Sequence, residues 1–227
     1  LLLSRLVYDG GGRGRPQREE RYGLPLLQAR VPQTGWHAGG SLRRAARGFR
    51  RAGGGRVLVP EGFSAWPLLE RYGLRRVDPV PFLRAHAAPL TLALLARMGV
   101  PPQQACVALR GREVDRSMVQ AAQILCPQVR EIAVSAPGGG ERLARWLREE
   151  YGLPVRPDGE DVDAVVRFHP GTEKGGRGAL SLFGPQPDLA GIQVSAPTLE
   201  EGDRRDLGLL CALWETEKLG KRPLEFT

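Results

Sequence analysis

The sequence contains very little lysine, no closely spaced pair of cysteines and no long apolar run. Only Lys174, Lys218 and Lys221 are lysines, so arginine supplies the other 30 of the 33 basic residues. GC-rich coding explains this skew better than a demand for guanidinium chemistry does, and we therefore discount the high isoelectric point. No apolar stretch approaches the roughly 18 to 20 residues that cross a bilayer, so we expect no membrane span.

Cysteine usage points to a reducing compartment. Cys106, Cys126 and Cys211 are odd in number and far apart in the chain, which is typical of buried free thiols in the cytoplasm; a catalytic cysteine is the alternative. No group of cysteine, histidine and carboxylate residues has metal-ligand spacing, so the sequence predicts no metal site. Leu1–Tyr8 is too short for the apolar core of a signal peptide, and we interpret it as a first strand.

Positive charge is concentrated at one end of the chain. Residues 1–56 contain 12 arginines against three acidic residues, Asp9, Glu19 and Glu20, whereas the rest of the chain is close to neutral. A helix predicted over Ser41–Ala52 places Arg43, Arg47 and Arg50 on one side. Such a surface suits an acidic partner protein or nucleic acid phosphates, and a solvated arginine face is the alternative.

Apolar runs alternate with amphipathic helical patterns, which is typical of parallel βαβ units. The clearest part extends from Cys106 to Pro170 and reads as strand, helix, strand, helix, strand and strand. We therefore predict an α/β fold with a mostly parallel, Rossmann-like sheet. Two lobes are expected: a basic α/β lobe over residues 1–100 and a Rossmann-like lobe over residues 101–227 that includes a C-terminal helix. Val100-Pro101-Pro102 marks the boundary.

A recurring Tyr-Gly-Leu phrase predicts where helices end. It occurs at Tyr22-Gly23-Leu24, Tyr72-Gly73-Leu74 and Tyr151-Gly152-Leu153, where glycine would adopt the left-handed conformation after a last turn. The first of these predicts a short helical turn before residue 22. Three further boundary signals are a Ser64 cap, a kink or restart at Pro89, and a capping box of Thr198 and Glu201 that opens a helix to about Leu219. These expectations rest on the local sequence alone.

The second lobe resembles the NADP-binding domain of the shikimate dehydrogenase and glutamyl-tRNA reductase type. The residues that carry the resemblance are Arg130–Ser135, similar to that family's second strand, and Glu141–Leu147, similar to the helix after it. The resemblance implies an NADP cofactor bound at a first loop of pattern GxGxxG. Here that loop reads Gly111-Arg112-Glu113-Val114-Asp115-Arg116-Ser117 and keeps only Gly111. Two alternatives therefore remain for this lobe: it binds a dinucleotide despite the altered loop, or it binds another ligand or none.

Candidate ligand-binding residues follow the predicted parallel strands, because such sheets bind ligands at the carboxyl ends of their strands. The first loop supplies Gly111, Arg112 and Ser117. The next supplies Ser135 and the run Gly138-Gly139-Gly140, which precedes a helix whose free amides would attract an anion. The alternative for this run is a flexible connection in which Glu141 compensates the helix dipole.

His169 ends the last predicted strand of this series and is our candidate catalytic residue. Histidine titrates near neutrality, which suits general acid–base catalysis; a histidine hydrogen-bonded within its own loop is the alternative. The following glycine-rich segment, Gly171–Gly178, contains Thr172 and Lys174, which would close on an anionic group if the segment is more than a surface loop.

Two functions therefore remain open. The first is a cytoplasmic Rossmann-like protein that binds a small anionic or nucleotide ligand, with a divergent NADP-type oxidoreductase as its most specific form. The second is a non-catalytic interaction protein whose basic N-terminal lobe contacts a partner protein or nucleic acid. Fold alone does not decide between them.

Overall fold

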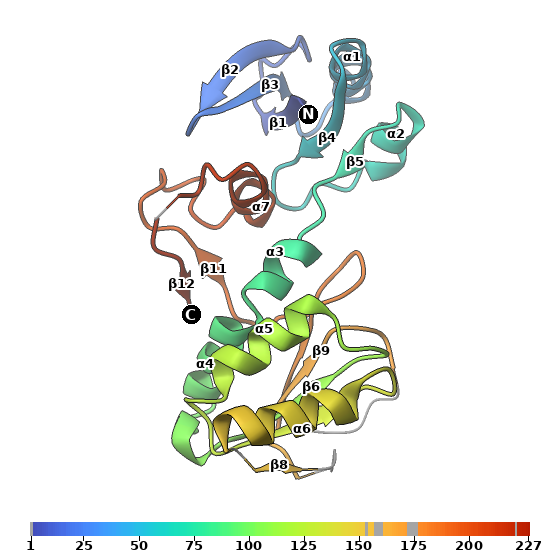
Figure 1. Ribbon diagram of the computed structural model, residues 1–227. Helices are drawn as coiled ribbons and strands as arrows, with labels where there is room; N and C mark the ends of the chain where they lie inside the picture. The colour runs from blue at the N-terminus through green and yellow to red at the C-terminus, as the bar shows by residue number, and fades with distance from the viewer. Residues whose placement is uncertain (1, 153, 157–160, 172–176, 221) are drawn as a thin grey trace. The chain divides into compact units, whose positions relative to one another are not determined.

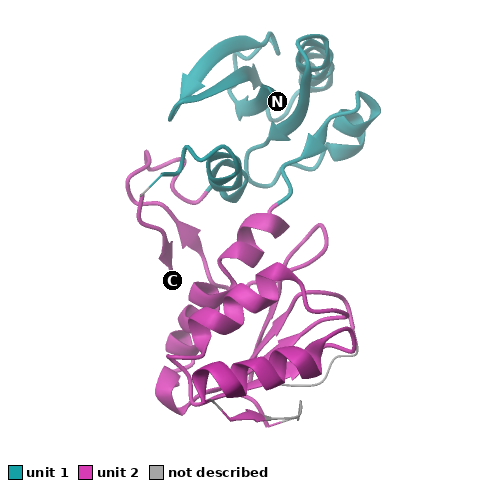
Figure 2. Cartoon of the chain, viewed as in Figure 1, with its two compact units in different colours: residues 1–78, 206–221 teal, residues 79–205, 222–227 magenta. Residues whose placement is uncertain are grey.

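The protein, described here from a computed structural model, folds into two compact units (Figure 2). The structure describes residues 2–152, 154–156, 161–171, 177–220 and 222–227. Unit 1 comprises Leu1–Asp78 and Asp206–Lys221, and unit 2 comprises Pro79–Arg205 and Arg222–Thr227. The division thus follows Asp78 rather than Val100, and the last helix belongs to unit 1 rather than to the second lobe.

The last helix joins unit 1 through direct contacts. This helix, α7 (Leu207–Glu215), begins at Asp206, whose carboxylate accepts the Leu209 amide at 3.0 Å. A Cβ added to Gly208 would lie 2.9 Å from the Leu58 side chain, and Glu215 forms an ion pair with Arg56. The capping box of Thr198 and Glu201 does not form a helix start, because Asp206 caps the helix later in the chain.

Unit 1 is built on a five-stranded sheet in the order β2-β3-β1-β4-β5 (Figure 1). All neighbouring strands are parallel except β2, which runs antiparallel to β3. A core of aliphatic and aromatic side chains, with Phe49 fully buried, joins the sheet to its helices. The elements are β1 (Leu2–Tyr8), β2 (Gln17–Arg21), β3 (Leu24–Val31), α1 (Ala38–Arg51), β4 (Gly54–Leu58), α2 (Trp66–Arg71) and β5 (Arg75–Arg76).

The first Tyr-Gly-Leu phrase makes a hairpin, so the predicted helical turn before it is wrong. Tyr22 and Gly23 have φ angles of 53° and 80°, and they connect β2 to β3 as a two-residue turn. Positive φ at both central positions is what a tight hairpin turn requires. Tertiary pairing with β3 therefore overrides the helical propensity of Gln17–Arg21.

The other glycine stops end helices as predicted. Gly73 has a φ of 70° after α2, and Leu74 donates its amide to the Leu69 carbonyl at 3.2 Å. Gly152 has a φ of 63° at the end of the helix α6 (Gly140–Tyr151). The start of α2 differs from the prediction, since Ala65 rather than Ser64 occupies the N-cap and no side chain caps the helix.

Unit 2 contains a parallel five-stranded sheet in the order β10-β9-β6-β7-β8. Numbered by their order within this sheet, the strands lie 5-4-1-2-3, which is the Rossmann arrangement. The predicted Rossmann-like α/β fold is confirmed. Its elements are α3 (Val80–Ala85), α4 (Ala87–Arg97), η1 (Pro102–Gln104), β6 (Cys106–Arg110), α5 (Arg116–Leu125), β7 (Glu131–Ser135), α6, β8 (Val155–Arg156), β9 (Ala164–Arg167) and β10 (Gly178–Ser181), followed by a small antiparallel pair, β11 (Val194–Ser195) and β12 (Glu225–Phe226).

The two faces of this sheet carry different side chains. Helices α4, α5 and α6 lie on one face (Figure 1), where a Cβ added to Gly178 would lie 3.1 Å from Leu94 of α4 and 2.7 Å from Met98, the C-cap of that helix. The opposite face bears a cluster of mostly small side chains from the strands and one adjoining residue: Cys106, Ala108, Ala133, Val162 and Val165. The two faces therefore differ in the size of their side chains, and the smaller ones lie on the face away from α4, α5 and α6.

Helix boundaries in unit 2 are set by single residues. Helix α5 begins at Arg116, because the Asp115 side chain accepts the Met118 amide at 2.8 Å and caps the helix. The helical stretch before it restarts at Ala87, after His86, and not at Pro89. None of the described helices is long and apolar enough to span a membrane.

The three cysteines are buried and free, as predicted. Burial raises the pKa of Cys126 to about 11, and burial with nearby carboxylates, Glu215 first among them, raises that of Cys211 further. Both thiols are therefore held in the protonated form, which is a poor nucleophile.

His86, at the junction of α3 and α4, makes the stability of unit 2 sensitive to pH. Its ring lies 4.4 Å from that of Phe82, and Nδ1 lies 2.8 Å from the Phe82 carbonyl. Burial lowers its pKa below 6.5, against the smaller raising effect of that carbonyl. The unfolded chain therefore takes up a proton first as pH falls.

We expect the free energy of unfolding to decrease as pH falls from 6.5 to 5, by at most about 1.4 kcal/mol per pH unit from this group. In His86→Gln this part of the pH dependence should disappear. Urea unfolding at pH 7 and pH 5 measures the free energy of unfolding of both proteins. If it changes between the two pH values by the same amount in His86→Gln as in the parent protein, the assignment is contradicted.

Candidate ligand site at the carboxyl edge of the second sheet

The carboxyl ends of β6, β7 and β9 form the edge of unit 2 at which the strand order reverses. The chain passes from β6 to β7 on one side of β6 and returns to β9 on the other, so the reversal lies between β6 and β9. Open α/β sheets bind ligands at this position. The carboxyl edge between β6 and β9 is therefore the candidate ligand site of unit 2.

The loops after β6 and β7 are hydrogen-bonded to each other. The Gly111 amide donates to the Ser135 carbonyl at 2.9 Å, and Gly138 exchanges two bonds with the first loop, to Arg112 and from Val114, at 3.0 and 2.8 Å. A Cβ on Gly138 would lie 2.9 Å from that of Glu113. The structure thus brings the predicted residues of the two loops together, but it uses their backbone groups to close the loops on each other.

A carboxylate already occupies the start of α5, where a Rossmann domain usually holds a pyrophosphate. Asp115 caps the helix through its Oδ1 atom and pairs with Arg84 through Oδ2 at 3.2 Å. Arg84 comes from α3, and its other nitrogens donate to the carbonyl oxygens of Phe168 and, at 2.9 Å, Leu182. An additional anion here would meet the Asp115 charge.

Four adjacent strands end in a row of polar residues in register. The Cα partners are Ser181 with Arg167, Arg167 with Arg110, and Arg110 with Ser135. Because aligned residues of parallel strands point to the same side, the four side chains share one face of the sheet. This face is the one opposite α4–α6. We call these residues the polar row.

Arg110 is the deeply placed member of the polar row. It is only 7% exposed, whereas Arg167 is half-buried. Neighbouring strands lie about 4.8 Å apart, so two guanidinium-bearing side chains project side by side from β6 and β9. The register therefore places two guanidinium-bearing side chains next to each other at the reversal point.

His169 lies at the same edge, two residues beyond the end of β9. A Cβ on Gly111 would lie 3.1 Å from His169 Nδ1, which places the ring against the end of β6. That nitrogen is buried and has no hydrogen-bond partner within the described part of the chain, although the residue as a whole is half-exposed. An unsatisfied buried nitrogen calls for an explanation, and a bound ligand is one.

A cavity at the carboxyl edge lies beside the start of α6. It has a volume of about 370 Å³, and Ser135, Gly139, Gly140 and Arg142 contribute to its lining. No side chain caps this helix, and its N-cap, Gly139, adopts φ 91°. The first turn also contains Glu141, which opposes an anion. Ser135 belongs both to this cavity and to the polar row.

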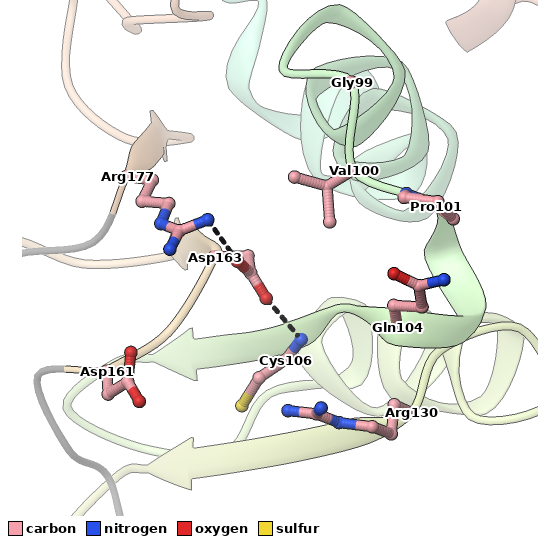
Figure 3. Close-up of a pocket in the computed structure, with 9 residues that line it drawn as sticks. All are labelled: Gly99, Val100, Pro101, Gln104, Cys106, Arg130, Asp161, Asp163 and Arg177. Carbon is pink, nitrogen blue, oxygen red and sulfur yellow. Dashed lines mark hydrogen bonds and ion pairs between the residues drawn. The ribbon is translucent and has the colours of Figure 1, made fainter.

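A larger cavity of about 570 Å³ lies at the opposite, amino edge of the sheet (Figure 3). Asp163 is its fixed element, since it accepts the Cys106 amide at 2.9 Å and lies 3.6 Å from Arg177. Arg130 and Asp161 complete a lining of two cations and two carboxylates. This balance of charge gives no preference for an anion, and the sequence did not predict the cavity.

The remaining predicted residues divide into three groups. Arg112 is exposed and contributes its carbonyl to the loop contact, and Ser117 is half-buried in the first turn of α5. Thr172 and Lys174 lie outside the described residues. Among the residues that are described, no group of histidine, cysteine and carboxylate side chains could hold a metal ion.

Sequence reasoning missed Arg84, Arg110 and Arg167. A signal for two of them exists, because each of two apolar strands ends in arginine, as Ala-Leu-Arg before Gly111 and as Val-Val-Arg before Phe168. An arginine that ends a buried parallel strand stands at the ligand-binding edge. Arg84 had no such signal, since its partners are 31 to 98 residues away.

No family model and no curated protein matches this chain. Among solved structures it is similar to quinate dehydrogenase from Corynebacterium glutamicum in complex with NAD (15% identity, TM-score 0.29, 76% of this chain and 74% of that one). It is also similar to a shikimate dehydrogenase in complex with NADP+ (12%, 0.28, 73% and 65%). A third match is ornithine carbamoyltransferase from Pyrococcus furiosus (13%, 0.28, 73% and 58%).

These matches include the dehydrogenase type that the sequence resembles. They also include a carbamoyltransferase, and the chain spans less than two thirds of the length of the last two proteins. At 12–15% identity and TM-scores of 0.28–0.29, the likeness says nothing about the activity of this chain.

Asp115 should contribute measurably to the stability of unit 2, because it both caps α5 and balances Arg84. We expect Asp115→Ala to lower the free energy of unfolding by about 2 kcal/mol, of which roughly 1 kcal/mol is the lost cap. Asp115→Ser keeps a capping oxygen without the charge and should recover about half. Urea unfolding tests this, and an Asp115→Ala variant as stable as the parent protein would contradict it.

Proposed function

We propose that unit 2 binds a small anionic ligand, through a carboxylate or phosphate group, at the carboxyl edge of its sheet. The observation that carries the proposal is the register of Arg110 with Arg167 at the point where the strand order reverses. Guanidinium groups recognise carboxylates and phosphates through paired hydrogen bonds, which a flexible ammonium does not reproduce. In this proposal the two arginines hold the charged group of the ligand.

The rest of the edge provides secondary contacts in this proposal. Ser135 and Ser181 flank the arginines in the row and add hydroxyl groups on either side. The cavity beside α6 shares only Ser135 with the row, so a ligand would reach its polar lining of Arg142 and the Gly139–Gly140 backbone by extending past the end of β7. A nucleotide monophosphate or a phosphorylated sugar has the two polar ends that this arrangement accommodates.

His169 is the residue that would move a proton if the ligand is transformed. Its ring lies against Gly111, and its buried Nδ1 atom has an unused capacity for a hydrogen bond among the described residues. A general acid or base must reach the reacting group within hydrogen-bond distance. The proposal therefore assigns ligand binding to Arg110 and Arg167, and proton transfer to His169 for a ligand that extends over the end of β6 toward Met118 of α5.

A divergent NADP-type oxidoreductase is the more specific form of this proposal, and the first loop argues against it. The start of α5 holds Asp115 with Arg84, and the loop before it is bonded to Gly138. A pyrophosphate would have to displace both contacts. The anion site proposed here needs neither change, because the polar row lies on the other face of the sheet.

Binding of simple anions tests the proposal. The unfolding temperature should rise with inorganic phosphate or malonate and should reach saturation; at 100 times the dissociation constant, ligand adds about 2.7 kcal/mol of stability. In Arg110→Lys and Arg167→Lys, which retain the positive charge but lose the guanidinium, affinity should fall at least tenfold. Arg145→Lys, at an exposed position on α6, is the matched control. Unchanged affinity in both row variants would refute the proposal.

The closed first loop leads to a separate expectation for dinucleotides. NADPH should show no saturable binding below about 1 mM, because Asp115 holds the helix terminus that the pyrophosphate requires. Titration followed by nicotinamide fluorescence measures this directly, with NADH alongside. Tight, saturable binding of NADPH would instead make unit 2 an oxidoreductase domain with an opened loop.

A further inference from the structure

The whole net charge of the chain resides in unit 1. Unit 1 contains 17 basic and 9 acidic residues, for a balance of +8, whereas unit 2 contains 16 of each. GC-rich coding would raise arginine content throughout the chain, so it does not explain an excess confined to one unit. The excess of positive charge is therefore a property of unit 1 itself.

Helix α1 provides one such surface. Between residues 43 and 51 every exposed side chain belongs to arginine, and the helix contains no acidic residue. The apolar side chains, Leu42, Ala45, Ala46 and Phe49, are buried in the core. A solvent-exposed helix face normally mixes both signs of charge. The exposed arginines are Arg43, Arg44, Arg47, Arg50 and Arg51.

This arrangement is unfavourable for the helix by itself. Arg47 lies three or four residues from Arg43, Arg44, Arg50 and Arg51, and like charges at these spacings repel each other. The two arginines of the last turn are favoured by the helix dipole, but those in the first half of the helix are not. A polyanion along this face would convert the repulsion into attraction.

The positive surface continues onto the loop after β1. Ser41 donates its hydroxyl to the Gly12 carbonyl at 3.3 Å, and Arg44 donates to the Arg13 carbonyl at 2.6 Å. Gly14, with a φ of 66°, lies so close beneath Ser41 that a Cβ would be 1.9 Å from its carbonyl oxygen. At 100° per residue, Arg44 lies between this loop and the row of Arg43, Arg47 and Arg50, so the surface is continuous.

The same loop borders a cavity of about 240 Å³ with a cationic lining. Arg13, Arg15 and Arg30 contribute to it, and Asp9 is the single carboxylate in its lining. Asp9 is already engaged by Arg30 at 3.4 Å and by the Gly11 amide at 3.0 Å. The cavity thus has two cations in excess, next to the arginine face of α1.

An exposed aromatic side chain stands at the start of α1. Trp36 is 90% exposed and precedes the helix by two residues. Its ring lies 3.5 Å from that of His37, with an angle of 34° between the planes. An exposed indole two residues before the arginine-bearing helix suits stacking with a nucleobase.

We propose that unit 1 binds single-stranded nucleic acid. The phosphates lie along the arginine face of α1 and reach the cavity of Arg13, Arg15 and Arg30, while a base stacks on Trp36. Charge complementarity selects a polyanion, and the exposed indole selects one with aromatic bases over an acidic peptide or an anionic membrane.

Fluorescence anisotropy with a labelled 15-nucleotide oligothymidine tests this on the full chain. Affinity should fall as salt rises from 50 to 200 mM. The triple variant Arg43→Gln, Arg47→Gln, Arg50→Gln should bind at least tenfold more weakly, and the slope of log affinity against log salt should decrease by about 2. Trp36→Ala should weaken binding about tenfold while the slope is unchanged.

The control is an equal removal of charge from unit 2. Arg116→Gln, Arg145→Gln and Arg148→Gln are at exposed helix positions, and together they should leave affinity and salt slope unchanged. Circular dichroism should show each variant folded. The proposal is overturned if the chain does not bind the oligonucleotide or if the two triple variants have the same affinity for it. It is also overturned if polyglutamate or phosphatidylserine vesicles bind as tightly as the oligonucleotide while Trp36→Ala leaves oligonucleotide binding unchanged.

Discussion

Arg84 connects three segments of unit 2 that are far apart in the sequence. Its guanidinium donates to the carbonyls of Phe168 and Leu182, which follow β9 and β10, and pairs with Asp115 at the start of α5. Backbone carbonyls just beyond a strand have no ladder partner, and leaving them buried without a donor is costly. Only arginine offers donors in a planar fork that reaches three acceptors at once.

The carboxyl edge of unit 2 depends on this residue. Because Arg84 fixes the Phe168 carbonyl, it also fixes the chain on either side, where Arg167 joins the polar row and His169 meets Gly111. Because it balances Asp115, the first loop can end in a carboxylate where other Rossmann domains admit a phosphate. The departure from the glycine motif and the position of the polar row are thus parts of one arrangement.

Local signals predicted the alternation of strands and helices but not their tertiary partners. The apolar run at Cys106–Arg110 and the glycine stops at Gly73 and Gly152 work through adjacent residues, so the sequence alone was sufficient. Gln17–Arg21 has helix-forming residues, and only pairing with β3 makes it a strand. The contiguous sequence contains no information of that kind.

The candidate site was predictable to the same extent. Its location followed from the strand order expected of a Rossmann-like sheet, and Ser135 and His169 were identified on that basis. The alignment of Arg110 with Arg167 depends on the register of strands that are 57 residues apart in the chain, which no periodicity reveals. Arg84 contacts this edge from α3, a helix that precedes the first strand of the sheet in the sequence. Long-range register and side-chain reach are therefore what the sequence leaves undetermined.

The hairpin at Tyr22–Gly23 also has a consequence for how unit 1 behaves in concentrated solution. It places β2 at the end of the sheet order, where one side of the strand has no neighbouring strand among the residues that the structure describes. Such an edge can recruit the edge of another molecule. The strand is short and reads Gln-Arg-Glu-Glu-Arg, and its mixed charges would have to be desolvated by any added strand. The charged residues of β2 led to the incorrect prediction of a helical turn. The same residues disfavour the addition of a strand from another molecule to this edge of the sheet.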